Sequence, residues 1–219
     1  MEVWNYINGH WVDIGNWTVA HLWLILVSNS VAVFIGVSLG IFIAGKGREE
    51  IADTVLYLAG IMMTIPSLAL FGLLMPLLSA LKLPMIGFLP AVIALILYGQ
   101  LPILRNTYTA IREVDPAMIE AGRGMGMTPR QILLKIKLPL AVPIIMAGLR
   151  NAVVINIGIA TIAVFIGANG LGKPIFRGLR TTRTDMIITG AVFVSILALI
   201  VDSLLALAER KLTPEGLKK

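Results

Sequence analysis

The chain has 219 residues, of which 58% are hydrophobic and only 14% are charged, and its mean hydropathy is +0.90. A soluble domain carries about 25% charged residues, and several runs here exceed the ~20 apolar residues that cross a bilayer. The absence of cysteine excludes disulfides, zinc–thiolate sites and thiol catalysis. The sequence therefore predicts a polytopic membrane protein, whose net charge of +6 indicates basic cytoplasmic loops rather than nucleic-acid binding.

Residues 1–20 are predicted to form an interfacial segment that lies along the membrane surface. Trp4, Trp11 and Trp17 lie in this segment and Trp23 follows it, which accounts for all four tryptophans of the chain. Aromatic residues concentrate at membrane interfaces, and the segment lacks the basic start and cleavage site of a signal peptide. An aromatic cage for a quaternary ammonium ligand is the alternative interpretation, but anchoring is favoured.

The remainder, residues 21–219, is predicted to be one all-α transmembrane domain with about five membrane-spanning helices. Prolines inside these spans remove backbone donors, so neighbouring helices or a water-filled path must satisfy the freed carbonyls. Gly36 and Gly40 form a small-xxx-small pattern that favours close helix packing. The predicted spans are 21–44, 54–80, 85–104, 140–168 and 186–208.

The distribution of Lys and Arg predicts the orientation of these spans. Twelve basic residues fall on one side, in the loops after the first, third and fifth spans, including Lys218 and Lys219 at the end of the chain. Five fall on the other side, four of them in the loop 169–185. We therefore expect the N-terminus outside the cell and the C-terminus inside.

The segment 105–137 is the one sizeable cytoplasmic loop that this orientation leaves, so contacts with a soluble partner are expected there. Asp115 can cap a helix that begins at Pro116, the position that proline favours. Gly124 and Gly126 then permit the chain to reverse. The local sequence thus predicts a short helix followed by a glycine turn.

A second short helix is predicted directly after the turn. Thr128 caps it, Pro129 occupies its first position, and Gln131 completes a capping box. The helix is expected to stop before Pro139, because the proline ring disfavours a helical residue ahead of it. An ordinary amphipathic surface segment is the alternative, but two successive caps favour a docking element. One face of this helix is apolar, with Ile132, Leu133 and Ile136.

The same segment resembles the EAA motif of ABC importer permeases. That motif reads E-A-A, three residues, G, nine residues and I-x-L-P, and both spacings fit here without a gap; Gly122 replaces the second alanine. In such permeases the segment is a coupling helix that sits in a groove of an ATPase. The resemblance therefore implies an ATPase-coupling role for Glu120, Ala121, Gly122, Gly126, Ile132, Leu133, Ile136, Leu138 and Pro139.

Further stretches along the chain, including LPLAVPIIMAGLRNAV and IGIATIAVFIGANGLGKPIFRGL, resemble permeases for quaternary-amine osmoprotectants such as glycine betaine, choline and carnitine. The resemblance implies a methionine-importer-type ABC permease fold in the cytoplasmic (inner) membrane of a bacterium or archaeon. It also implies a second permease copy or paralogue, a cytoplasmic ATPase dimer and an extracytoplasmic substrate-binding protein. ATP and Mg²⁺ would be bound by the ATPase, and this chain would carry no cofactor or metal and catalyse nothing.

Two charged residues, Arg150 and Asp202, are predicted to lie inside the fourth and fifth spans, in the inner half of the bilayer. An unpaired charge there costs at least about 2.5 kcal/mol, so we expect these two side chains to pair with each other. The pair would be either part of the gate or a structural staple, and the staple is favoured.

Polar side chains inside the spans are candidates for the substrate path. A quaternary ammonium donates no hydrogen bond, so aromatic faces and partial negative dipoles would hold it. Such side chains more often bond to neighbouring helices. The candidate path residues are Thr64, Pro66, Ser67, Tyr98, Gln100, Asn156 and Thr161.

Two alternative functions remain for comparison. An importer for methionine or another amino acid shares the EAA motif. An integral membrane enzyme would need clustered Asp, Glu, His or Ser near one interface, but the spans offer one clear carboxylate, Asp202, and the two histidines, His10 and His21, lie toward the outside. A permease is therefore favoured over an enzyme.

Overall fold

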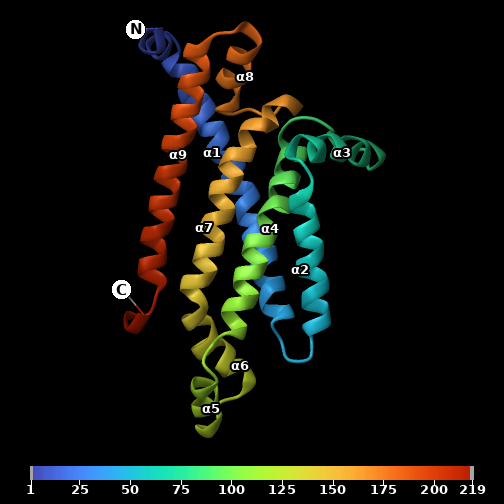
Figure 1. Cartoon of the computed structure of the whole chain (residues 1–219), viewed down its shortest axis with the longest axis vertical. Coiled ribbons are helices and arrows are strands. Elements are labelled where there is room, and N and C mark those ends of the chain that lie inside the picture. The colour runs from blue at the N-terminus through green and yellow to red at the C-terminus, as the bar shows by residue number, and fades with distance from the viewer. Residues whose placement is uncertain (1, 218–219) are drawn as a thin grey trace.

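The computed structural model describes residues 2–217, which form helices and no strand, so Lys218 and Lys219 of the orientation argument lie outside it. The first helix, α1 (Glu2–Ile43), has a backbone break at His10, where φ is −131° and ψ is 20°. Its first turns therefore bend away from the long axis of the bundle (Figure 1). Residues 11–20 of the predicted interfacial segment continue directly into the first long helix, and the interfacial position of residues 1–20 stays a prediction.

The second predicted span, 54–80, is two helices rather than one. α2 (Glu49–Thr64) and α3 (Ser67–Ala80) meet at an angle of 105°. Pro66 at the junction disfavours a helical residue before it, and Ile65 is accordingly extended, with φ −69° and ψ 124°. α3 projects sideways from the bundle (Figure 1).

The remaining long helices are α4 (Phe88–Arg112), α7 (Leu138–Ile162) and α9 (Thr184–Leu212). α4 runs beyond the predicted end of the third span, so residues 105–112 of the predicted loop are helical. Four helices of the described residues are long and apolar enough to cross a membrane, and five when the bent α2–α3 pair counts as one span. The prediction of about five spans is confirmed.

The two ends of the bundle carry short elements. A 3₁₀ turn (Ala163–Ile166) and α8 (Gly172–Thr181) close the end at which α1 begins. α5 (Pro116–Gly124) and α6 (Pro129–Ile132) form a hairpin at the opposite end, which we call the α5–α6 end (Figure 1). A 3₁₀ turn (Glu215–Leu217) ends the described chain.

The centre of the bundle is the contact of α1, α4 and α7, where small residues allow the backbones to approach. Gly36 of α1 faces Ile103 of α4, and Gly40 faces Thr107. A Cβ on either glycine would come within 2.6 or 2.7 Å of these side chains. The small-xxx-small pattern is thus the contact between α1 and α4.

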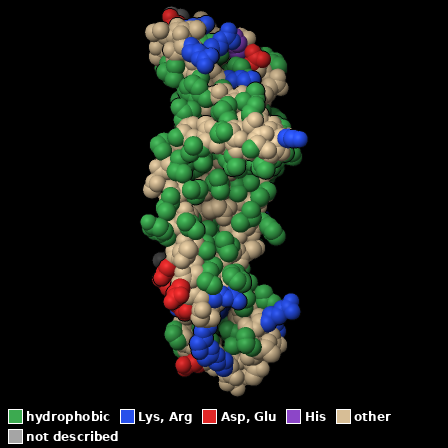
Figure 2. All heavy atoms as spheres, turned by 90° about the vertical axis from the view of Figure 1, so that its right-hand side faces the viewer, with side chains coloured by type: hydrophobic (Ala, Val, Ile, Leu, Met, Phe, Trp, Pro, Cys, Tyr) green, Lys and Arg blue, Asp and Glu red, His purple; other side chains and the backbone are tan. Residues whose placement is uncertain are grey.

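Figure 2 shows that hydrophobic side chains cover the middle of the visible face, while Lys, Arg, Asp and Glu gather mainly at its two ends. An apolar band between two charged ends is the surface that a bilayer requires of a helical membrane protein. The band matches the helices identified as long and apolar enough to span a membrane.

Candidate coupling segment and membrane path

The hairpin at the α5–α6 end begins with α5, whose start is fixed by a cap and a proline. The Asp115 carboxylate accepts a hydrogen bond from the backbone N–H of Ala117 at 2.8 Å, and Pro116 is the first helical residue. The helix ends at a turn in which Gly126 has φ +76°, a conformation that side chains with a Cβ rarely adopt. Both features follow from the local sequence.

The second arm, α6, begins with a capping box. The backbone N–H of Thr128 donates to the Gln131 side chain at 2.8 Å, and the N–H of Gln131 donates to the Thr128 hydroxyl at 3.3 Å. Together these bonds satisfy two of the free donors of the first turn. The predicted capping of this helix is therefore present in the structure.

The expectation that the second helix stops before Pro139 is wrong. α6 continues through a π-helical turn, Leu133–Lys137, into α7. The backbone N–H of Leu138 bonds to the carbonyl of Leu133, five residues back. A π turn widens the helix locally, which accommodates a proline that lacks an N–H and would otherwise clash with a carbonyl of the preceding turn.

The residues of the EAA-like pattern fall into two groups by exposure. Glu120, Ala121 and Gly126 are exposed, whereas Gly122 and Ile132 are buried. A Cβ on Gly122 would lie 2.7 Å from the end of the Ile136 side chain, so this glycine lets α5 pack closely against the π turn. The remaining members, Leu133, Ile136, Leu138 and Pro139, are half-buried.

Exposure thus separates a contact surface from an internal support. Glu120, Ala121 and Gly126 can touch another protein, while Gly122 and Ile132 hold the hairpin together. Met118 and Met125 also project from the hairpin, exposed to 47% and 74%. Sequence reasoning missed these methionines, although a flexible exposed Met is typical of an adaptable binding surface.

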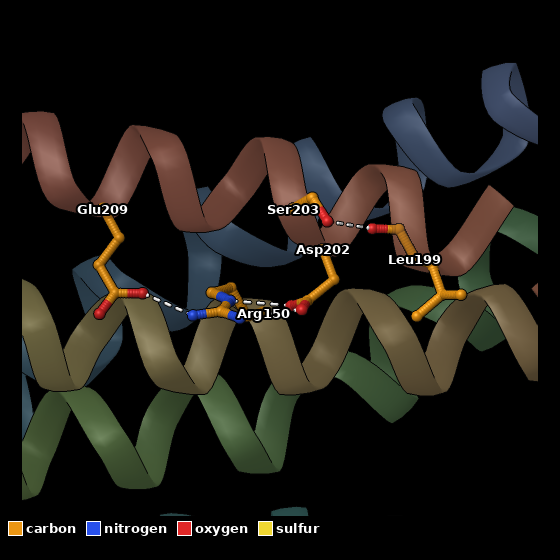
Figure 3. Close-up of polar contacts among 5 residues, drawn as sticks. All are labelled: Arg150, Leu199, Asp202, Ser203 and Glu209. Carbon is orange, nitrogen blue, oxygen red and sulfur yellow. Dashed lines mark hydrogen bonds and ion pairs between the residues drawn. The ribbon is translucent and has the colours of Figure 1, made fainter. Parts of the chain in front are cut away.

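Arg150 on α7 faces two carboxylates on α9 (Figure 3). Its Nε and one terminal nitrogen donate to the two oxygens of Asp202 at 2.8 and 2.9 Å, a bidentate arrangement. Its other terminal nitrogen donates to Glu209 at 2.9 Å. The structure therefore brings the two predicted partners together and adds Glu209, a third member that the sequence argument missed.

The three side chains tie the part of α9 near the α5–α6 end to α7. They are partly exposed, between 24% and 36%, and α9 leaves many of its apolar side chains uncovered, with Leu199 at 69% and Leu204 at 59%. The ion pairs are therefore a specific link in a region with little apolar burial. With one cation and two carboxylates, the cluster carries a net charge of −1.

Three of the seven candidate path residues, Tyr98, Gln100 and Asn156, donate hydrogen bonds to other segments of the bundle. The Tyr98 hydroxyl donates to the carbonyl of Ile65, at the break between α2 and α3. Asn156 is fully buried and donates to the Asn29 side chain and to the Leu95 carbonyl, each at 3.0 Å. Asn156 thus links α7 to α1 and α4, and Tyr98 links α4 to the bend between α2 and α3.

Of the other candidates, Thr64, Pro66 and Ser67 lie at the same α2–α3 bend as the Tyr98 hydrogen bond, whereas Gln100 and Thr161 lie on α4 and α7. Gln100 donates to the carbonyls of Ala32 at 3.3 Å and Ile96 at 3.2 Å. Thr161 donates within its own helix at 2.7 Å, and Pro66 and Ser67 form the start of α3. Thr64 is exposed and lines a groove between α2 and α4 whose walls also include the apolar Leu56 and Ile61. The seven residues do not converge on one site in this chain.

Metal binding was not predicted. Among residues 2–217, no group of three or more His, Cys, Asp or Glu side chains is placed to hold a metal ion.

Solved structures first establish the class of this fold. A chain of the methionine ABC transporter MetNI, solved in inward-facing conformations, superposes with a TM-score of 0.79 and 24% identity, over 92% of this chain and 96% of that one. An amino acid ABC transporter with histidines superposes with a TM-score of 0.73 and 22% identity, over 94% and 97%. The fold is that of an ABC transporter permease, as predicted.

A comparison of the sequence with protein-family models shows the family of this chain. Residues 36–214 match the family model described as "Binding-protein-dependent transport system inner membrane component". The chain belongs to this family of inner membrane transport subunits.

Curated relatives are similar over nearly the whole chain. The choline transport system permease protein OpuBB of Bacillus subtilis is 44% identical over 92% of this chain and 89% of its own length. The osmoprotectant import permease protein OsmW of Salmonella typhimurium is 45% identical over 92% of each. The carnitine transport permease protein OpuCB of Listeria monocytogenes is 40% identical over 97% and 93%.

Proposed function

We propose that this chain is the permease subunit of an ATP-driven importer for quaternary-amine osmoprotectants. The observation that carries the proposal is the similarity to permeases named for choline, carnitine and osmoprotectants, at 40 to 45% identity over 92 to 97% of the chain. The likeness to amino acid transporters concerns the fold alone, because those chains are less than 25% identical. Quaternary amines are therefore favoured over methionine or another amino acid as the cargo.

The α5–α6 end is the proposed cytoplasmic end of the bundle, where the hairpin docks into an ATPase. The capped, glycine-hinged hairpin and its exposed Glu120, Ala121 and Gly126 support this role. Because α6 continues into α7, a movement of the hairpin passes directly into a membrane-spanning helix. The N-terminus and α8 then lie at the extracytoplasmic end.

The proposed assembly holds two permease subunits, two ATPase subunits and an extracytoplasmic substrate-binding protein. The family description, a binding-protein-dependent system, supports the last of these. ATP and Mg²⁺ belong to the ATPase subunits, and the permease contributes no catalytic group. Inward- and outward-facing states then differ in energy through the contacts that the ATPase makes in each state.

Uptake by the reconstituted transporter tests this function. The permease is coexpressed with an ATPase and a substrate-binding protein of such an importer from the same organism, placed in proteoliposomes, and supplied with radiolabelled choline, glycine betaine, carnitine or methionine. We expect ATP-dependent accumulation of at least one quaternary amine and none of methionine. Accumulation of methionine alone, or of none of the four, would overturn the proposal.

A further inference from the structure

One face of α2 carries a stripe of polar and small residues. Asp53, Tyr57, Gly60 and Thr64 are spaced by four, three and four residues, which places them above one another on a helix. Apolar residues would be expected on a span that faces lipid on all sides. The stripe therefore distinguishes this face of α2 from the rest of the helix.

The stripe lines a groove of about 600 Å³ between α2 and α4. The same groove is lined from α4 by Arg105. Gly60 leaves it open, because a Cβ at this position would meet no atom within 4 Å. A carboxylate, an aromatic ring, a hydroxyl and a guanidinium thus share one open space.

The two charges in the groove have no ion-pair partner among residues 2–217. Asp53 and Arg105 are exposed, and neither forms an ion pair within 4.0 Å. The neighbouring pair of Glu49 and Arg112, on the same two helices, does form one at 3.0 Å. Charges in the groove are therefore available to a ligand, whereas those at the helix ends are already paired.

The groove charges lie near the ends of α2 and α4 that carry the Glu49–Arg112 ion pair. At 1.5 Å per residue, Asp53 is about 6 Å along α2 from Glu49, and Arg105 is about 10 Å along α4 from Arg112. Both charges therefore lie about one to two helical turns from that ion pair, on the side of the bundle that carries the α5–α6 end (Figure 1). These positions are a signal that sequence reasoning missed, because Arg105 was assigned to the loop.

We propose that this groove is the cytoplasmic part of the cargo path and that it recognises zwitterions with a quaternary ammonium at one end and a carboxylate at the other. The inference rests on the proposed function. The Tyr57 ring and the Asp53 carboxylate attract the ammonium, since a cation binds both an aromatic face and an opposite charge. Arg105 binds the carboxylate.

Glycine betaine and carnitine have both charges, whereas choline has an ammonium and a hydroxyl but no carboxylate. The groove therefore favours the two zwitterions, and the preference comes from Arg105. The ammonium contact from Asp53 and Tyr57 is common to all three cargoes.

Relative uptake of the three cargoes tests the role of Arg105. Proteoliposomes with the whole transporter are supplied with radiolabelled choline, glycine betaine or carnitine. We expect Arg105→Gln to lower the uptake of glycine betaine and carnitine about tenfold relative to choline, the size of one lost hydrogen bond to a charged group. Arg105→Lys, which keeps the charge, is expected to retain most of the preference.

Arg105 makes no hydrogen bond or ion pair within the described part of the chain, so its replacement removes no contact that holds the fold. An equal fall for all three cargoes, or no change for any, would overturn its role. Because the result is a ratio measured on one variant, a lower yield of transporter does not affect it.

The ammonium end is tested by variants of Tyr57 and Asp53. Tyr57→Leu and Asp53→Asn are each expected to lower uptake of all three cargoes about threefold or more, whereas Tyr57→Phe keeps the ring and most of the uptake. Glu50→Gln removes an exposed carboxylate of α2 outside the groove and is the matched control. Equal effects of Asp53→Asn and Glu50→Gln would contradict the assignment.

The outcomes of these experiments distinguish a failure of the groove assignment from a failure of the proposed function. If the native transporter accumulates none of the three amines, the proposed function fails. If it accumulates them and the Arg105, Tyr57 and Asp53 variants behave like the native protein, the function stands and the groove is not on the path.

Discussion

Arg150 binds two carboxylates of α9, so its removal leaves two negative charges close together and unpaired. Breaking a buried ion pair by removing one partner costs about 3–5 kcal/mol, and the partial exposure of these groups brings the cost below that range, to about 2–3 kcal/mol. Their geometry is bidentate, which adds both strength and orientation. The favoured role of the cluster is therefore structural.

Charge reversal tests this pairing. We expect Arg150→Asp and Asp202→Arg to lower the unfolding midpoint of the detergent-solubilised permease, each by the equivalent of about 2–3 kcal/mol. The double reversal should recover part of the loss, because opposite charges again face each other across α7 and α9. Recovery will be incomplete, since Glu209 then faces Asp at position 150. A double variant no more stable than the single ones would contradict the pairing.

Gly40 is a second residue whose size matters. A Cβ at this position would lie 2.7 Å from Thr107 on α4. We expect Gly40→Ala to destabilise the protein by about 1–3 kcal/mol through overpacking. Gly72→Ala is the control, because a Cβ on this helical glycine of α3 meets no atom within 4 Å; it should leave the unfolding midpoint unchanged or raise it. Thermal unfolding in detergent compares the two.

At the scale of the element, the α5–α6 hairpin depends on the turn at Gly126. Its positive φ strains any residue with a branched side chain by about 1–2 kcal/mol, and a distorted turn would misplace the contact surface for the ATPase. We expect Gly126→Val to lower ATP-driven uptake at least fivefold while ATP hydrolysis continues. Gly126→Asn should retain more uptake, because Asn tolerates this conformation. Unchanged uptake in the Val variant would count against the coupling role.

The hairpin was predictable because its signals are local. Asp115, Thr128 and the glycines act on backbone groups within a few residues, so the caps could be read from the sequence. The π turn was not predictable, because the sequence rule that stops a helix before proline ignores the tertiary packing that lets it continue. Asp202 was foreseen as a partner of Arg150 because it lies inside the predicted fifth span, 186–208. Glu209 was missed because it lies one residue beyond that span, although a spacing of seven residues places it on the same face of α9 as Asp202.

The α2–α3 bend likewise depends on contacts that the sequence alone does not show. The segment 54–80 was predicted to be one span, so the break at Pro66 was missed. The carbonyl of Ile65, which the break leaves free, accepts a hydrogen bond from the hydroxyl of Tyr98, 33 residues further along the chain. The groove between α2 and α4 is also a tertiary feature, because Asp53 and Arg105 line the same space only after the two helices pack. A sequence pattern shows which residues share one face of a helix, but it does not show which helix faces pack against each other.

At the scale of the whole molecule, the orientation can be tested directly because the chain has no cysteine. Met125→Cys, on the exposed hairpin, should react with a membrane-impermeant maleimide only in inverted membrane vesicles. Trp11→Cys, exposed to 70% near the opposite end, should react in right-side-out spheroplasts. Labelling of both from one side, or with the sides exchanged, would contradict the predicted topology.

The π turn between α6 and α7 affects how the hairpin is rotated about the axis of α7. Each residue of an α-helix advances the chain by about 100°, from 3.6 residues per turn, so the one extra residue in the widened turn sets the rotational phase of the hairpin about the axis of α7. Removing one residue from Leu133–Lys137 would restore regular periodicity and rotate the hairpin about the axis of α7, and it would also shift Ile136 away from Gly122 of α5. The π turn therefore fixes the direction in which the hairpin points relative to the membrane-spanning helices, and with it the orientation of the proposed contact surface for an ATPase.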